Sequence, residues 1–561
     1  MQLLNFLHVH KGVYKLRNVR GSSLPQLPNE IVKNARKTRL DSFAVALEGW
    51  RRGLKLKWYT KDSEHFQDMI IFGVNPPGRL YSLSSGKKTH YFFRTRGDKV
   101  SNEAVELVAD KGVTKEVLAK ANVPVPQGKG FSEDATDEEL IEYSKTLDYP
   151  LVFKPTDASL GDGVVTNIKN HEEFLDALHY VRHELGYKEV VIEQHVKGPE
   201  YRLYVIDDQV IGAYNRIPAN ITGDGIHTIE ELIELKNYER RRNARLNSCL
   251  INIDVEIEEY IAKKGYTLSS VPNKGEYILL RGKTNISSGG DPIDVTDKIS
   301  DEIKEIAVKA VKAIPGLHHA GVDIIVNESE NIKHPAVVLE INATAQIGGI
   351  LYPLKGKARN IPAAIIDYYF PETKGIDTSK SKIYFDMSTV LEPMENRAAL
   401  EVEVAPAPQG KLYAKRYLVT GNVAKETYHR FLKKEALDRN LHGHVKSLAF
   451  DEIEIIVAGK DQAAVENFKN VIRRYPQGSS IKKIKSENWN EPVAVGFDIL
   501  EMYHATTVRS ARHTLRRLEK EYIRLTRRKE RLEKDIAHIL NSTSWNIMNP
   551  FRRLSRKLKN N

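Results

Sequence analysis

GVDIIV (residues 321–326) and VVLEINA (residues 337–343) are two strongly apolar runs that carry Asp323, Glu340 and Asn342. We expect both runs to form strands, and because side chains alternate along a strand, Glu340 and Asn342 should share one face. Carboxylates in such runs are costly to bury unless they are paired or bind a metal ion. The pattern therefore favours a Mg²⁺ site made of hard oxygen ligands, and a structural ion pair with a neighbouring lysine or arginine is the alternative.

Strand-like and helix-like segments alternate around these two runs, from about residue 101 to residue 371. The segments 150–155, 190–196 and 201–206 are rich in β-formers, whereas 137–147, 172–185 and 301–314 repeat apolar residues at helical spacing. This alternation predicts an α+β domain of about 270 residues.

Two further segments of this domain suit a nucleotide. Lys154 ends the run PLVFKP and precedes a loop, 156–164, that contains Gly161 and Gly163. A cation beside a glycine-containing loop can hold polyphosphate, although such a loop also marks plain turns. Downstream, Glu193 and Glu200 flank a strand that could offer backbone hydrogen bonds to adenine and a carboxylate to ribose, and a solvated strand end explains these acids equally well.

Several segments of this region resemble known ligases. Residues 110–131 (DKGVTKEVLAKANVPVPQGKGF), 200–237, 265–297 and 357–371, together with the two strand runs, resemble the ATP-grasp domain of cyanophycin synthetase. The same region is similar to the ligase domain of bifunctional glutathione synthetases. The phrase TGDGIHTIEELI (222–233) is specific to that branch.

The resemblance implies a role for each matching residue. Nucleotide contacts are implied for Lys111, Lys154, Asp157, Ser159, Gly161, Gly163, Glu193, Gln194, Val196 and Glu200, and metal ligation for Asp323, Glu340 and Asn342. A polar wall around the transferred phosphoryl group and the substrate carboxylate is implied for Arg202, Arg216, Arg281 and Asn285. The implied cofactors are ATP and Mg²⁺, with Mn²⁺ as a substitute, and the implied chemistry is amide formation through an acyl phosphate. Lysine, arginine and Mg²⁺ are what a loose phosphoryl-transfer transition state needs.

The sequence also departs from the cyanophycin synthetase pattern. Residues 343–349 read ATAQIGG where that pattern continues with Ala-Pro-Gly, and Ala158, Leu160 and Asp162 replace the common Gly, His and Arg of the phosphate loop. These changes affect substrate identity more than nucleotide binding. No second ATP domain like that of Mur ligases is present, so we do not expect the polymerising reaction.

Residues 411–500 form a β-α-β-β-α-β pattern that predicts a ferredoxin-like fold and resembles acylphosphatase. In that family a loop cradles phosphate with an arginine, and an asparagine positions water. Here His429 occupies the arginine position, Arg430 follows it, Ser447 replaces the asparagine, and Glu426 adds a negative charge. These changes predict a degenerate domain that binds or packs rather than hydrolyses.

The remaining segments lie at the two ends and between the two domains. We expect a small α/β lead-in domain at 1–100, the ATP-grasp domain at 101–375, and a linker at 376–410 that contains VAPAPQG. Apolar residues from Leu515 to Ile539 follow a near-heptad spacing, which predicts one long helix at 505–541 that dimerises or packs on its own protein. A basic amphipathic tail, 542–561, resembles terminal motifs of enzymes that build cell-surface polysaccharides.

Charge and composition restrict the binding partners and the cell compartment that we expect. From residue 505 onward the chain has 16 Lys and Arg against 5 Asp and Glu, which accounts for the whole net charge of +11. A polyanion argument therefore concerns the tail, which would suit an acidic membrane surface better than nucleic acid. The single cysteine, Cys249, cannot form an intramolecular disulfide, and with no spanning segment or signal peptide we expect a cytoplasmic protein.

Taken together, the sequence predicts an ATP- and Mg²⁺-dependent carboxylate–amine ligase that releases ADP and phosphate and forms a homo-oligomer. The alternatives are an acylphosphatase-type hydrolase and a nucleotide-binding scaffold in cell-surface polysaccharide assembly. The sequence does not name the acid or the amine.

Overall fold

The computed structural model describes residues 22–73, 77–156, 163–326, 334–449, 451–474 and 480–500, together with residue 526. The predicted helix at 505–541, apart from Thr526, and the predicted tail at 542–561 lie outside the described residues. The chain forms two compact units, one containing residues up to Leu412 with Asn490–Gly496, the other Tyr413–Trp489 with the segment from Phe497 onward. Both units mix helices and strands, as the predicted α+β class requires. Within the described residues, no helix is both long and apolar enough to cross a membrane.

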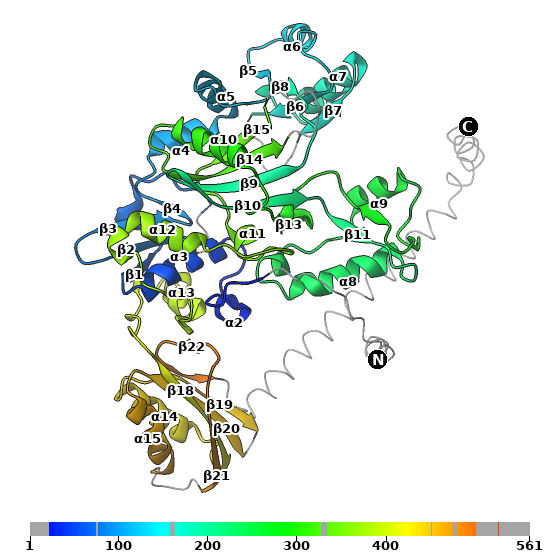
Figure 1. Cartoon of the computed structure of the whole chain (residues 1–561). Helices are drawn as coiled ribbons and strands as arrows, with labels where there is room; N and C mark the ends of the chain where they lie inside the picture. The colour runs from blue at the N-terminus through cyan, green and yellow to red at the C-terminus, as the bar shows by residue number, and fades with distance from the viewer. Residues whose placement is uncertain are drawn as a thin grey trace. The chain divides into compact units, whose positions relative to one another are not determined.

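The centre of the first unit is a five-stranded sheet in the order β13-β10-β9-β14-β15 (Figure 1). Its strands are β9 (Glu200–Ile206), β10 (Gln209–Ile217), β13 (Asp291–Asp294), β14 (His319–Val326) and β15 (Ala336–Asn342). The two runs that open the sequence argument are therefore neighbouring antiparallel strands, with Asp323 opposite Glu340.

One face of this sheet is covered by α10 (Asp301–Lys312), as Figure 1 shows. Ser300 caps the helix by accepting a hydrogen bond from the Ile303 amide, and Ile303, Ala307 and Ala310 face the strands. Helices α4 (Asn102–Ala109) and α5 (Lys111–Lys120) extend the same core. The opposite face is partly covered by α11 (Gly348–Leu351) and α12 (Ile361–Tyr369), and it carries polar side chains such as Arg202, because neighbouring residues of a strand point to opposite sides.

A four-stranded sheet, in the order β5-β8-β6-β7, carries the segments that the sequence predicts to bind a nucleotide. Its strands are β5 (Gly128–Phe131), β6 (Leu151–Pro155), β7 (Val165–Ile168) and β8 (Val190–Gln194), with α6 (Asp137–Ser144), α7 (His171–Leu178) and the π-helical turn η2 (His179–Glu184). Phe153 and Phe174 pack edge to face in its core. The predicted strand end at Lys154 is therefore present.

A subdomain lies between β10 and β13 in the chain and has its own small core. It contains β11 (Asn220–Thr222), α8 (Ile229–Arg241), η3 (Leu246–Ser248), α9 (Val255–Ala262), β12 (Tyr277–Leu279) and η4 (Ile286–Ser288). Thr228 and Glu231 form a capping box at the start of α8. Arg240 and Lys236 of α8 both reach Asp291 at the beginning of β13, which ties this helix to the central sheet.

The N-terminal part is not a separate domain, because its elements pack with later segments of the chain. The sheet β17-β1-β2-β3-β4 consists of β1 (Lys55–Tyr59), β2 (Leu80–Ser84), β3 (Thr89–Phe93), β4 (Arg96–Gly97) and β17 (Glu401–Glu403). The helices of this region are α2 (Asn29–Val32), α3 (Arg39–Arg51), α12 (Ile361–Tyr369), α11 (Gly348–Leu351) and the turns η1 (Glu64–Phe66) and η5 (Pro371–Thr373). Helix α12 packs directly on α3. A boundary at residue 100 therefore does not separate two compact bodies.

The predicted linker at 376–410 is also corrected. It contains β16 (Ile383–Tyr384), α13 (Met387–Glu395) and β17, and β17 pairs with β1. The strand β22 (Val493–Ala494) returns from beyond the second unit and pairs in parallel with β16. The proline- and glycine-rich stretch 404–410, which follows β17, makes up only the last few residues of this segment.

The second unit has the predicted ferredoxin-like order. It consists of β18 (Tyr413–Gly421), α14 (Glu426–Leu437), β19 (His442–Ala449), β20 (Glu452–Gly459), α15 (Gln462–Arg473), β21 (Ile481–Asn488) and β23 (Phe497–Leu500). The sheet order is β21-β18-β20-β19-β23, and the two helices share one core with it. The last strand, β23, is an addition that the sequence pattern does not indicate.

Candidate functional site

A buried cluster of opposite charges lies on the polar face of the central sheet. Arg202 of β9 donates from Nε to Asp323 Oδ1 at 2.5 Å and from Nη2 to Asp323 Oδ2 at 2.6 Å, a bidentate pair. Arg216 of β10 lies 3.1 Å from Asp323 Oδ2 and also pairs with Glu200. The register of the sheet produces this meeting, because Asp323 faces Arg202 across β14 and β9.

The two remaining metal-ligand candidates adjoin this cluster. Asn342 Nδ2 donates to Glu340 Oε1 at 2.9 Å, so both side chains lie on the same face of β15, as the alternation predicts. Glu340 Oε1 is 3.6 Å from Arg202, and the Glu340 side chain is 38% exposed. Asp323, by contrast, is held by two guanidinium groups, so Glu340 is the carboxylate of this set that solvent reaches most easily.

The electrostatics of Asp323 follow from these contacts. Burial by itself would raise the pKa of this carboxyl group, but Arg202 and Arg216 outweigh the burial and lower the pKa to about 2. In return, Asp323 holds the pKa of the buried Arg202 above its usual value. Asp323 is therefore ionised at any physiological pH.

A second charged group surrounds Glu193 in the four-stranded sheet. Lys154 Nζ donates to Glu193 Oε1 at 2.5 Å, and Lys115 of α5 pairs with the other oxygen of this buried carboxylate. Burial and the nearby Lys111 charge lower the pKa of Lys154 to about 8, and burial with Lys154 lowers that of Lys115 well below its usual value. Three ammonium groups thus gather at one place.

The lysine group and the carboxylate cluster belong to one region. The charge of Glu340 acts on the pKa of Lys154, which places the end of β6 within electrostatic reach of β15. Gly163 lies two residues before β7, at the end of the loop predicted to bind phosphate. It has a φ of +63°, and a β-carbon there would clash with Pro155. Asp157, Ser159 and Gly161 lie outside the described residues.

The other predicted site residues have the following positions. Gln194 ends β8, Val196 follows it half-buried, and Glu200 accepts a hydrogen bond from the Thr284 hydroxyl besides its pair with Arg216. Asn285 precedes η4, and its carbonyl accepts hydrogen bonds from the Gly290 amide and the Ser288 hydroxyl. These residues are compatible with a wall beside the charged cluster.

Arg281 is held by acidic residues of the subdomain. Its guanidinium pairs with Asp254 and Glu256 at the start of α9 and donates to the Asn252 carbonyl. The structure therefore gives Arg281 a role in fastening α9 to the subdomain core, and places it among carboxylates that the sequence analysis did not single out.

The segment after β15 closes the polar face from one side. A β-carbon at Gly321 would lie 2.5 Å from Ala345 Cβ, and one at Gly349 would lie 3.1 Å from Tyr214 Cζ, so residues 345–349 run close over β14 and β10. Tyr214 lies directly opposite Arg202 in the sheet register. This is the segment in which the sequence departs from the pattern of the relatives it resembles.

Sequence reasoning missed Lys115 and Tyr214. Lys115 follows Lys111 by four residues in an element with helical periodicity, so both lysines share one face of α5, and this spacing could have indicated the pair. Tyr214 gives no such signal, because its neighbours Arg202 and Asp323 come from other strands.

The acylphosphatase-like loop does not present a phosphate cradle at its first residues. The amides of Gly421, Asn422 and Val423 donate to the carbonyls of Asp451, Ser480 and Gly421. His429 is fully buried in α14, and Ser447 is buried on β19. Arg430 lies exposed on α14 and pairs with Glu426. His429 and Ser447 are thus closed to an anion, and Arg430 is exposed but already paired with a carboxylate.

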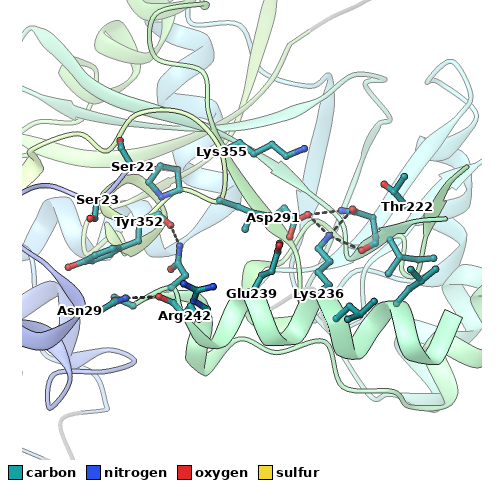
Figure 2. Close-up of a pocket in the computed structure, with 18 of the residues that line it drawn as sticks. Ser22, Ser23, Asn29, Thr222, Lys236, Glu239, Arg242, Asp291, Tyr352 and Lys355 are labelled. Carbon is teal, nitrogen blue, oxygen red and sulfur yellow. Dashed lines mark hydrogen bonds and ion pairs between the residues drawn. The ribbon is translucent and has the colours of Figure 1, made fainter. Parts of the chain in front are cut away.

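A separate cavity of about 530 Å³ lies beside α8 and is also lined by β11 and residues 352–355 (Figure 2). Lys236, Glu239 and Arg242 of the α8 region line it together with Asp291 and Lys355, and the dashed contacts join Lys236 to Asp291. None of the predicted site residues lines this cavity.

Comparison with known proteins finds a matching family model within each unit. The family model for RimK-like ATP-grasp domains matches residues 108–224, and the acylphosphatase model matches residues 415–499. The chain joins an ATP-grasp domain to an acylphosphatase-like domain. The first match contains Lys115, Lys154, Glu193 and Arg202, so the charged groups described above belong in large part to the ATP-grasp domain.

Several curated proteins are similar to the ATP-grasp part. Cyanophycin synthetase of Trichormus variabilis is 36% identical over 301 residues, which are 52% of this chain and 32% of that protein. The glutathione biosynthesis bifunctional protein GshAB of Clostridium perfringens is 35% identical over 299 residues, 52% of this chain and 37% of that protein. The chain spans about a third of the length of these relatives. A crystal structure of a bifunctional glutathione synthetase from Pasteurella multocida shows 29% identity and a TM-score of 0.43, covering 52% of this chain and 41% of that one.

Proposed function

We propose that the chain is an ATP- and Mg²⁺-dependent carboxylate–amine ligase that works through an acyl phosphate. The observation that carries the proposal is the buried cluster of Arg202, Arg216 and Asp323 beside Glu340, within electrostatic reach of Lys154. Such a cluster supplies positive charge and oxygen ligands and contains no serine or cysteine nucleophile. That is the composition that phosphoryl transfer to a carboxylate needs.

The nucleotide would lie between the two sheets. Lys154, Lys115 and Lys111 would contact its phosphates, with Glu193 keeping the first two lysines in place until ATP arrives. Gln194 and Val196 would border adenine and Glu200 would hold the ribose. Asp157, Ser159, Gly161 and Gly163 would form the loop over the phosphates.

The proposed magnesium ligands lie on β14 and β15, and Glu340 is the most accessible of them. Among the described residues, no three His, Cys, Asp or Glu side chains are grouped to hold a metal ion, and the candidate set is two carboxylates with the Asn342 amide. Mg²⁺ is usually bound by one or two carboxylates together with substrate phosphates and water, so a small set suffices. Asp323, Glu340 and Asn342 would hold the ion, which when bound would neutralise charge on the transferred phosphoryl group. Mn²⁺ has the same ligand preference and would serve as a substitute.

In the proposed reaction, a carboxylate oxygen of the acid attacks the γ-phosphorus of ATP, and ADP leaves. An amine then attacks the acyl carbon, phosphate leaves, and the amine loses a proton to give the amide. Arg202 and Arg216 are fixed by Asp323 and would face the negative charge on the phosphoryl oxygens without having to reorganise. Asn285 would border the same space.

The identity of the acid and the amine does not follow from the relatives. The relatives are named for cyanophycin and glutathione synthesis, and this chain covers a third of their length and differs at residues 343–349. We propose small molecules as both substrates, a cytoplasmic location, and homo-oligomer formation.

The test is ADP release by the full chain with Mg-ATP across pools of amino acids, small peptides and sugar acids. The blank is Glu340→Ala, and the matched control is Glu395→Ala, an exposed acid that pairs with Arg39 on α3. We expect release with one pool in the wild type and in the control, and a loss of at least a hundredfold in Glu340→Ala. Release that is equal in Glu340→Ala and the wild type contradicts the proposal.

A further inference from the structure

Arg245 differs from the other arginines of the site in the atoms that it contacts. Arg202, Arg216 and Arg281 each pair with a carboxylate. Arg245 instead donates from Nη2 to Gln346 Oε1 at 2.8 Å and from Nη1 to Cys249 Sγ at 3.1 Å. No carboxylate of the described residues lies within ion-pair distance of its guanidinium, so its positive charge is not balanced by a contact.

Both the backbone and the side chain of Arg245 are fixed by their neighbours. The side-chain oxygen of Asn243 accepts hydrogen bonds from the amides of Arg245 and Leu246. A β-carbon at Gly348 would lie 2.5 Å from Arg245 Cδ, so the side chain passes where only glycine leaves room. The guanidinium is therefore oriented before any ligand binds, which lowers the entropic cost of binding.

Arg245 also borders the charged cluster. It lies against Gly348, and the next residue, Gly349, lies against Tyr214, the strand neighbour of Arg202. Burial raises the pKa of Tyr214, and the charges of Arg202, Asp323 and Arg245 all act on it. Tyr214 therefore lies close enough to both the Arg202–Asp323 cluster and Arg245 for their charges to act on its hydroxyl group.

We propose that Arg245, oriented by Gln346, is a subsite for a free carboxylate of the substrate, distinct from the carboxylate that becomes phosphorylated. The proposal rests on the ligase function proposed above and gives it a substrate class: dicarboxylic acids, amino acids or peptides with a free carboxylate.

The chemistry of a guanidinium supports this class. The arginine side chain has five N–H donors in a planar fork. In Arg245, Nη2 donates one hydrogen bond to Gln346 and Nη1 donates one to Cys249, so three donors are left for a planar carboxylate. Binding an anionic ligand releases more free energy at a half-buried cation that lacks a carboxylate contact, as Arg245 does, than at a cation that is already paired. Gln346 lies in the segment 343–349, where substrate identity was expected to be set.

The test measures binding by calorimetry to the full chain in the presence of Mg-ADP. The probes are matched pairs that differ in one group: glutarate and glutaric monoamide, and each amino acid of the stimulating pool with its carboxamide. If no pool stimulates ADP release, all twenty amino acids are used. The variants are Arg245→Ala and Arg245→Lys, with Arg242→Ala as the control, because Arg242 is an exposed arginine on the same connection.

We expect at least one acid to bind the wild type ten to a hundred times more tightly than its amide. Arg245→Ala should remove this difference, Arg245→Lys should restore part of it, and Arg242→Ala should leave it unchanged. Melting temperatures of the variants within a few degrees of the wild type show that the fold is kept.

Two results would overturn the subsite: no acid in the panel binds the wild type better than its amide, or Arg245→Ala keeps the full acid preference. Failure of the ligase function is a separate result, because then ADP release is missing for every pool while the acid preference and its dependence on Arg245 can still be present.

Discussion

At the scale of single residues, Lys154 links burial to pH dependence. Its pKa of about 8 means that it loses its proton in the range where an exposed lysine stays charged. If the protonated form holds the ATP phosphates, kcat/KM for ATP should be level below pH 8 and fall up to tenfold per pH unit above it. Lys154→Arg should flatten this profile, because a guanidinium stays protonated. The exposed Lys298→Arg is the control, and a profile that Lys154→Arg does not change contradicts the prediction.

The same pKa has a consequence for stability. Between pH 8 and about 10.5 the unfolded chain binds a proton at Lys154 and the folded chain does not, so this residue makes the folded state more stable as pH rises through that window. The sign is the same as for Asp323, whose lowered pKa also makes the folded state more stable as pH rises, but in the acidic window between about 2 and 3.8.

The residues of the candidate site were only partly predictable from the sequence. Asp323, Glu340 and Asn342 were found because carboxylates in apolar runs are unusual, and alternation placed the last two on one face. The pairing of Asp323 with Arg216 and of Glu193 with Lys115 does not follow from these patterns, because the partners lie on elements distant in sequence. The ion pair of Arg281 with Asp254 is a further contact that the sequence pattern does not indicate.

At the scale of elements, α8 depends on one buried carboxylate. Asp291 pairs with Arg240, whose side chain is fully buried, at 2.7 Å and with Lys236 at 2.6 Å. Asp291→Asn should leave the two cations uncompensated and lower the free energy of unfolding by about 3–5 kcal/mol. Asp301→Asn on α10 is the control, because its side chain is 92% exposed, and it should cost about 0.5 kcal/mol or less. Denaturant unfolding measures both, and equal costs would show that the buried cluster does not stabilise α8.

The elements themselves followed the sequence where apolar runs were long and bounded by turns. The strands β6, β8, β9, β14 and β15 and the helix α10 lie at the predicted places. Short pieces such as β16 and β17 were missed, because two or three residues carry no periodicity and pair only with partners far along the chain. The predicted linker at 376–410 was wrong for this reason.

The acylphosphatase-like loop leads to a prediction of absent activity. The amides of Gly421, Asn422 and Val423 are bonded to carbonyls, and His429 is buried where the family has an arginine. We therefore expect the full chain to hydrolyse acetyl phosphate no faster than buffer, measured as phosphate release in the Glu340→Ala background to exclude the ligase site. Hydrolysis that persists in this background and disappears in Arg430→Ala would contradict the expectation.

At the scale of the whole molecule, the chain leaves the first compact unit after Leu412 and returns to it at Asn490. The returning segment contributes β22, and Val493 pairs with Ile383 of β16. A chain cut after residue 412 therefore loses a strand of the first unit. Within the second unit, the amide of Trp489 donates to the Ala414 carbonyl at 2.9 Å, so residues 414 and 489 lie together, and β23 continues this unit after residue 496.

This geometry predicts how the ATP-grasp unit can be isolated. A chain in which a short Gly-Ser linker replaces residues 414–488, ending at residue 496, should keep β22 and melt within a few degrees of the same unit in the full chain. The chain that ends at 412 should melt several degrees lower, because a pair of strand residues and the buried Val493 are missing. Val493→Ala in the linker chain is the matched test, since it removes buried side-chain volume but keeps the backbone pairing. If both shortened chains melt alike and Val493→Ala has no effect, β22 does not stabilise the unit, and the return of the chain at 490–496 then has no structural role in it.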